Sequence, residues 1–156
     1  MSTMTATAKT LLCLGMEDGA AAKIVGNDLR IVGGKEARWR WLTARPGPLY
    51  AIHSEGKVLF IGRAFGTLSK RLASLQAPAT GSHDEIIYRG IRKVLSIGKE
   101  VRIFVLPIEA PLSWCGFSVD LAAGIERSLV RFFEPPWNSI QGGVFLTETE
   151  INGQAN

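Results

Sequence analysis

The sequence predicts a small mixed α/β (α+β) domain, a three-stranded antiparallel sheet flanked by helices, from three observations. The short apolar runs Leu49–Ile52 and Val58–Ile61 flank a polar segment around Gly56, which is typical of a β-hairpin. Two segments with helical spacing of their apolar residues follow. A strongly apolar run, Val101–Ile108, then precedes one more helical segment. This order of elements predicts one sheet covered by helices.

Ahead of the first hairpin, the sequence predicts three short elements. Met1–Lys9 is small and polar, so we expect this terminus to fray. The apolar run Thr10–Leu14 predicts a strand. Lys23–Val25 and Leu29–Val32 flank a Gly-Asn-Asp turn sequence, which predicts a small hairpin.

The break Pro46-Gly47-Pro48 divides the predicted organisation of the chain. Residues 1–46 are expected to form an N-terminal extension, residues 47–145 the core domain, and residues 146–156 a C-terminal tail. Residues 36–42, just before the break, fit either a helical turn or a strand.

Two helices are predicted after the Tyr50 hairpin. Thr67 or Gly66 can cap the first, which runs to about Gln76. Asp84 can cap the second, which ends at Gly98. The apolar stripes that support them are Leu68, Leu72 and Leu75 in the first helix and Ile87, Ile91, Val94 and Leu95 in the second.

A third helix is predicted near the C-terminal end of the core domain. Ser118 can cap it, it continues to Phe133, and Pro135-Pro136 ends it. Residues 111–117 before it, and residues 77–82 between the first two helices, are expected to be loops because they hold proline or glycine.

Composition limits the class of protein. The chain has 156 residues, 46% of them apolar, which suits one folded domain. Cys13 and Cys115 have no neighbouring His or Cys, so neither a zinc site nor a disulfide framework is expected. No apolar run approaches the length of a membrane helix, and no secretory signal is visible. A cytoplasmic protein without membrane contact is expected.

The net charge of +4 permits a polyanionic partner. Basic residues interleaved with aromatic ones suit phosphate contacts combined with base stacking. The alternative is a solvated basic surface with tryptophans in the core. The candidate nucleic-acid-binding residues are Arg38 and Arg40, which alternate with Trp39 and Trp41, and Lys70, Arg89 and Arg92.

Two tripeptides on the predicted hairpin, Pro48-Leu49-Tyr50 and Phe60-Ile61-Gly62, are followed in order by Arg71, Glu126 and Asn138 on later elements. In this order the chain, from about Gly47 to Gln141, resembles the GIY-YIG nuclease family. The resemblance implies a metal-dependent endonuclease acting on double-stranded or branched DNA. It also implies that specificity comes from added segments or from a homodimer.

The residue types suit the hydrolysis of a phosphodiester bond. Glu126 offers a hard carboxylate for Mg²⁺ or Mn²⁺, which need few protein ligands. Arg71 offers a planar fork for phosphate oxygens. Tyr50 is the candidate for proton transfer from water. Arg63 could contact phosphate and lower the pKa of a neighbouring phenol. For each, an ordinary core or surface role is the alternative.

Three residues are expected to support the site. Gly62 allows a close approach of backbone at the strand end. Asn138 orients a loop near the site, or satisfies a turn. Phe60 stands where the family carries a second tyrosine, so Tyr50 must act without a second hydroxyl.

This departure leaves alternatives open. His83 in the loop before the second helix could replace the missing group, although a loop histidine is more often a surface residue. A catalytically degenerate nucleic-acid-binding module is the alternative to an active nuclease, and an interaction domain without nucleic acid is the third hypothesis.

Overall fold

The structure is a computed structural model that describes residues 6–108 and 112–138. Its main feature is a five-stranded sheet in the order β2-β1-β5-β3-β4, in which every neighbouring pair is antiparallel. The elements are α1 (Ala6–Cys13), β1 (Glu17–Val25), β2 (Asp28–Gly33), α2 (Glu36–Ala44), β3 (Leu49–Ser54), β4 (Lys57–Arg63), α3 (Leu68–Gln76), α4 (His83–Ser96), β5 (Val101–Leu106), β6 (Leu112–Trp114), β7 (Phe117–Val119) and α5 (Leu121–Phe133).

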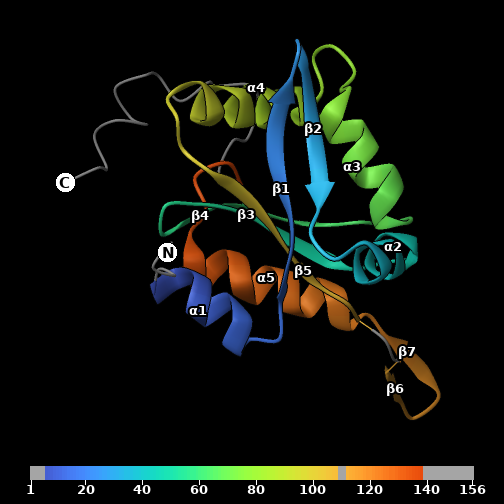
Figure 1. The fold of residues 1–156 in the computed structure, drawn as a ribbon. Coiled ribbons are helices and arrows are strands. Elements are labelled where there is room, and N and C mark those ends of the chain that lie inside the picture. Colours follow the sequence, from blue (N-terminus) through green and yellow to red (C-terminus); the bar gives the residue numbers. More distant parts are fainter. Residues whose placement is uncertain (1–5, 109–111, 139–156) are drawn as a thin grey trace.

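The sheet separates two hydrophobic cores, so the molecule has three layers (Figure 1). Helices α2, α3 and α4 cover one face, against which Tyr50 and Ile52 of β3 pack. Helices α1 and α5 cover the other face, where Leu49 and Ala51 pack. Strand β3 is buried along its whole length, because alternate side chains enter the two cores.

The predicted α+β class with an antiparallel sheet is confirmed, but the sheet has five strands rather than three. The predicted hairpin around Asn27 exists, and its strand β1 pairs with β5, which continues the sheet beyond β3 and β4. Local patterns predicted the hairpins β1–β2 and β3–β4. The pairing of β1 with β5, in contrast, joins segments about eighty residues apart in the chain.

The expected strand at Thr10–Leu14 is wrong, and so is fraying through Lys9, because helix α1 spans Ala6–Cys13. Ala8 and Leu11, three residues apart, are both buried against the sheet. This is helical rather than alternating spacing, and alanine, lysine and leucine favour helix. Residues 36–42, left undecided by their pattern, lie in helix α2.

The Tyr50 hairpin and all three core helices were predicted correctly, with different caps on two helices. Thr67 caps α3 by accepting a hydrogen bond from the Lys70 amide, as expected. Ser82 rather than Asp84 caps α4, and Asp120 rather than Ser118 caps α5. Each true cap lies two residues from the predicted one, and its side chain accepts from the third helical residue's amide.

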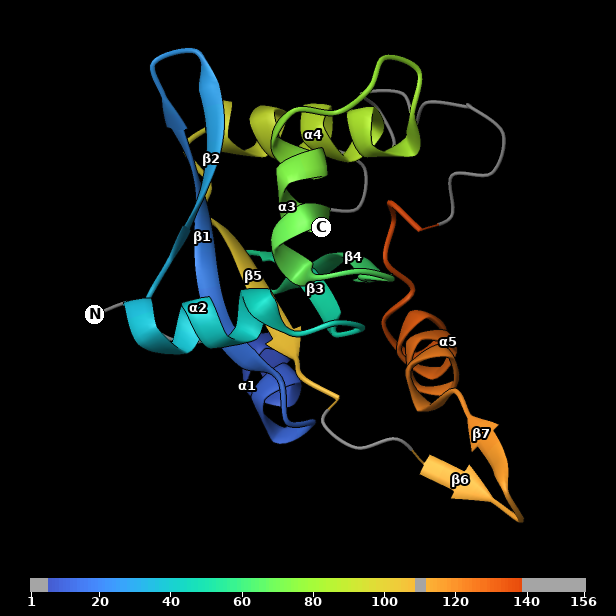
Figure 2. The same cartoon turned by 90° about the vertical axis from the view of Figure 1, so that its right-hand side faces the viewer.

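The segment predicted as a loop at residues 111–117 contains a further hairpin. Strands β6 and β7 pair across a two-residue turn at Cys115 and Gly116, both of which have positive φ angles, 49° and 83°. Figure 2 shows this hairpin projecting from the body beside the start of α5. No helix among the described residues is long and apolar enough to cross a membrane. The expected tail at residues 146–156 lies outside the described residues.

Candidate active site

Tyr50 and Arg71, predicted from separate motifs, are in direct contact. The Arg71 Nε–H donates a hydrogen bond of 2.8 Å to the Tyr50 hydroxyl oxygen. Tyr50 pairs with Gly62 on β4, and a Cβ at Gly62 would lie 2.8 Å from the Tyr50 hydroxyl oxygen. Glycine is therefore required here for the phenol to cross the neighbouring strand and reach α3.

Asp84 on α4 holds the Arg71 guanidinium in place. Arg71 Nη1 lies 2.6 and 2.5 Å from the two Asp84 carboxylate oxygens, and the Ser74 hydroxyl donates to the same carboxylate at 2.6 Å. Although burial opposes it, these hydrogen bonds leave the pKa of Asp84 below its usual value. The ion pair fixes the direction of Arg71 Nε, while Arg71 Nη2 has no hydrogen bond to the described residues.

The Tyr50 phenol is fully buried, and this burial raises its pKa to about 12. The positive charge of Arg71 and its hydrogen bond lower the pKa, but by less, while the carboxylates of Asp84 and Glu126 raise it. The expected lowering of this pKa by a nearby cation is therefore outweighed by burial. Tyr50 keeps its proton at neutral pH, and that proton has no acceptor among the described residues.

Phe60 and His83 complete the surroundings of Tyr50. The Phe60 ring centroid lies 5.9 Å from that of Tyr50 and 5.8 Å from that of His83. Phe60 is buried, whereas His83 is exposed at the first position of α4. The Phe60 ring thus contacts both the Tyr50 ring and the His83 ring.

Glu126 lies on α5, which packs on the opposite face of the sheet, and its charge is near enough to raise the pKa of Tyr50. Its side chain is half-buried, and among the described residues no hydrogen bond or ion pair satisfies its carboxylate. Burial raises the pKa of Glu126, the negative charge of Asp120 raises it too, and Arg63 opposes both. Glu126 also lines a shallow hollow of about 410 Å³ on α5, together with Arg127 and Arg131.

Arg63 links the end of β4 to the start of α5. Its Nη1 donates a hydrogen bond of 2.7 Å to Asp120, the N-cap of that helix. Its guanidinium also stacks on Phe65, 4.9 Å from the ring centroid. The Arg63 Nε is buried and has no hydrogen-bond partner in the described part of the chain. Such an unpaired buried donor is uncommon in folded proteins.

Asn138 contacts the strand backbone rather than the polar groups around Tyr50. Its amide accepts from the Ile61 N–H at 2.9 Å and donates to the Ile61 carbonyl at 2.7 Å. The Trp137 amide donates to the Leu59 carbonyl beside it, and the Trp137 ring is buried against Gly90 of α4. The Pro-Pro-Trp-Asn segment thereby fixes the outer edge of β4.

The predicted nucleic-acid-binding residues are mostly engaged within the protein. Arg38, Arg40 and Arg89 form ion pairs with Glu17, Glu36 and Glu85, respectively. Arg92 donates to the Asn27 carbonyl at 2.6 Å. Lys70 is exposed on α3, next to Arg71.

Sequence patterns missed several residues around the site. Asp84 was expected as a helix cap and instead binds Arg71, and Ser74 was not considered. Asp120, Arg127 and Arg131 were also missed. The helical spacing of Arg127 and Arg131 around Glu126 is a signal that could have indicated a shared face.

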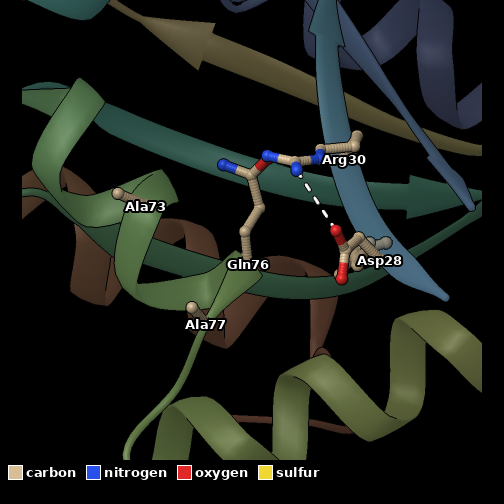
Figure 3. A pocket seen from close by; sticks show the side chains of 6 residues that line it. Asp28, Arg30, Ala73, Gln76 and Ala77 are labelled. Atoms are coloured by element: carbon tan, nitrogen blue, oxygen red, sulfur yellow. Dashed lines mark hydrogen bonds and ion pairs between the residues drawn. The ribbon is translucent and has the colours of Figure 1, made fainter. Parts of the chain in front are cut away.

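A second hollow, of about 270 Å³, lies between β2 and the end of α3 (Figure 3). The Asp28–Arg30 ion pair and Gln76 line it, and the Gln76 side chain accepts a hydrogen bond from the Ile31 amide. None of the predicted site residues lines this hollow.

Glu126 offers a single carboxylate to a magnesium-type ion, in a hollow that Arg127 and Arg131 also line. No group of three or more His, Cys, Asp or Glu side chains suited to a metal exists among residues 6–108 and 112–138. Mg²⁺, however, is often bound through one or two carboxylates while it retains several waters. A half-buried, unpaired carboxylate beside a hollow open to solvent meets that requirement.

Comparison with known proteins relates the fold to a phage protein. The chain superposes on a mutant of EndoII from bacteriophage T4 with a TM-score of 0.66 and 14% sequence identity, over 85% of this chain and 98% of that chain. The chain therefore shares the α+β fold of that protein. The restriction endonuclease HPY188I in complex with product DNA matches at a TM-score of 0.46 and 15% identity, over 93% and 94% of the two chains, which does not establish a shared fold. No protein-family model and no curated protein matches the sequence.

Proposed function

We propose that the chain is a metal-dependent endonuclease of the GIY-YIG type that hydrolyses phosphodiester bonds in DNA. The observation that supports this most is the Tyr50–Arg71 hydrogen bond, which joins two residues that the GIY-YIG resemblance singles out on separate elements. A phenol, a guanidinium and an unpaired carboxylate from three elements are the groups this reaction needs.

Arg71 and Arg63 bind the phosphate in this proposal. Arg71 Nη2 offers two N–H donors while Asp84 holds the rest of the guanidinium. Arg63 adds positive charge close enough to act on Glu126. Donors that are fixed before the substrate binds stabilise the negative charge of the transition state most effectively.

In this proposal the Tyr50 phenol first loses its proton, and the resulting phenolate orients the attacking water and takes a proton from it. The hydroxyl oxygen is held by Arg71, which would stabilise the phenolate when it forms. Because Phe60 has no hydroxyl, no second phenol on this hairpin can share the task. His83, in contact with the Phe60 ring, is a candidate to relay the proton to solvent.

Glu126 would hold Mg²⁺ or Mn²⁺, with Arg127 and Arg131 beside it to contact the DNA backbone. The ion would supply positive charge that polarises the phosphate and assists the leaving oxygen. Cys13 and Cys115 are free and exposed, which suits a reducing compartment such as the cytoplasm.

Phe60 favours one alternative, a DNA-binding module that has lost cleavage. Its ring is buried next to Tyr50 and His83 and carries no hydroxyl, so this position cannot supply the second phenol that the GIY-YIG pattern has. In that case the Tyr50–Arg71–Asp84 contacts would serve stability alone.

Incubation of the purified chain with supercoiled plasmid in Mg²⁺ or Mn²⁺, with a parallel reaction in excess chelator, tests the proposal. Nicked or linear plasmid is expected only when the metal is free. Absence of cleavage by a folded preparation that still retards DNA in a gel would favour the binding module.

A further inference from the structure

The β6–β7 hairpin presents an unpartnered apolar face. Residues directly opposite in a hairpin share a face, and successive residues alternate between faces. The pairs Leu112–Val119 and Trp114–Phe117 therefore share one face, and the pair Ser113–Ser118 occupies the other. Trp114 and Phe117 at the tip are 73% and 74% exposed.

Strand β7 of the hairpin is anchored at its end through the start of α5. Val119 leads directly into Asp120, which caps α5 through the Ala123 amide and binds Arg63 of β4. The same Arg63 stacks on Phe65, which is 85% exposed. An exposed aromatic side chain therefore lies against the residue that we expect to contact phosphate, and the hairpin joins α5 at the N-cap that the same residue binds.

The dimensions of the hairpin suit the interior of a DNA duplex. Three residues per strand extend about 10 Å, a length comparable to the depth of a DNA groove, roughly 8 Å. The left-handed Cys115-Gly116 turn keeps the tip narrow. Large apolar side chains on such projections can enter between base pairs and unstack them.

A second copy of the chain fits this face less well. Each large aromatic side chain buries about 150–250 Å² when fully covered. Two partly exposed aromatic residues with two small aliphatic neighbours on each copy would therefore bury at most roughly 1,000 Å² in total. Stable protein interfaces bury about 1,200 Å² or more, and the positive charge of Arg63 at the base favours a polyanion.

We propose that the β6–β7 hairpin is a wedge, in which Trp114 and Phe117 insert into the base stack of DNA bound at the candidate active site. This inference rests on the proposed function for the identity of the partner. It assigns the substrate a further property, because DNA that is unpaired or easily unstacked next to the bound phosphate would bind more tightly than stiff duplex.

The test uses the full chain, a chelator to prevent cleavage, and a short DNA duplex that carries 2-aminopurine, whose fluorescence rises on unstacking. Wild type should raise the fluorescence, and the double variant Trp114→Ser/Phe117→Ser should not. Stacking of one base on an aromatic side chain is worth roughly 5- to 150-fold in affinity, so the double variant should bind at least about fivefold more weakly. A mismatch beside the 2-aminopurine should strengthen DNA binding by the wild-type chain but not by the double variant.

Phe132→Ser is the matched control, because Phe132 is also an exposed aromatic, 70% accessible, at the other end of α5. It should leave fluorescence and affinity unchanged. Unchanged fluorescence and affinity in the double variant would overturn the wedge. So would a wild-type dimer that the double variant converts to monomer without loss of DNA affinity, since the face would then bind a second copy. If the wild-type chain unstacks DNA through this hairpin but does not cleave plasmid, the wedge is supported and only the proposed nuclease activity is rejected.

Discussion

The Tyr50 cluster and the Glu126 hollow lie on opposite sides of strands β3 and β4, and their polar groups are satisfied very differently. In the first, Tyr50, Arg71, Asp84 and Ser74 bind one another at 2.5–2.8 Å. In the second, the half-buried Glu126 carboxylate has no partner among the described residues. A satisfied network can be explained by folding alone. A half-buried carboxylate without a partner, whose pKa burial raises, is instead a candidate for a functional role.

The largest effect is expected for Glu126→Ala. It should reduce the cleavage rate by at least roughly 10³-fold, because binding of a metal that stabilises the transition-state charge is worth several kcal/mol. Thermal stability should stay the same or rise, since no described contact is lost. Glu36→Ala, on the exposed surface of α2, is the matched control. Turnover that survives Glu126→Ala would show that the metal lies elsewhere.

Tyr50→Phe should lower the cleavage rate by about 10²–10⁴-fold, the usual contribution of one positioned proton-transfer group. Tyr88→Phe changes the only other tyrosine, which also accepts a hydrogen bond from an arginine, and should leave the rate unchanged. Both rates are measured on plasmid under identical conditions. Full activity in Tyr50→Phe would redirect attention to His83 and return the Tyr50 cluster to a purely structural role.

Arg71→Ala should destabilise the fold by about 2–4 kcal/mol, because it leaves the Asp84 carboxylate and the Tyr50 hydroxyl without their partner. Arg30→Ala removes an exposed ion pair at 3.2 Å and should cost less than about 1 kcal/mol. Urea denaturation measures both. Equal losses in the two variants would mean that the Tyr50 cluster is not an energetic unit.

The raised pKa of Tyr50, about 12, predicts the pH dependence of cleavage. Below that value the fraction of phenolate grows with pH, so the rate should rise by about tenfold per pH unit between pH 7 and 9. Tyr50→Phe should flatten this profile. A wild-type rate that is constant over the range would exclude the Tyr50 phenolate as the base.

The smallest effect is expected for Phe60→Tyr. It restores the family's tyrosine pattern, but Phe60 is buried next to Tyr50 and His83, and an active site adapted to its absence gains nothing from a new hydroxyl. The cleavage rate should stay within about tenfold of wild type, or fall. Cleavage that appears only in Phe60→Tyr would identify the natural chain as a degenerate binding module.

Local sequence signals predicted the elements of this fold better than their association. The Tyr50 hairpin, helix α3 with its Thr67 cap and the end of α5 before Pro135-Pro136 all follow from short-range propensities. The pairing of β1 with β5 could not be predicted in this way, because it depends on contacts between distant segments. The hairpin β6–β7 was missed because its strands have three residues each.

In the candidate site, too, the sequence predicted the residues but not the contacts between them. The order of Tyr50, Arg71 and Glu126 along the chain could be recognised from motifs. That Arg71 contacts Tyr50 depends on how α3 crosses the sheet, and the role of Asp84 depends on how α4 packs beside α3. A carboxylate at a helix start looks like a cap in the sequence, and only the tertiary structure shows that Ser82 takes that role.

The contacts of Asn138 and Trp137 with β4 also bear on how this protein avoids aggregation. Strand β4 is the last in the sheet, and an open strand edge is a template on which other chains can assemble into β-structure. Asn138 occupies both backbone groups of Ile61, and Trp137 occupies the carbonyl of Leu59. A fragment that stops before Pro135 would keep Tyr50, Arg71 and Glu126 but uncover this edge. Recombinant fragments should therefore extend at least through Asn138 if they are to remain dispersed at high concentration.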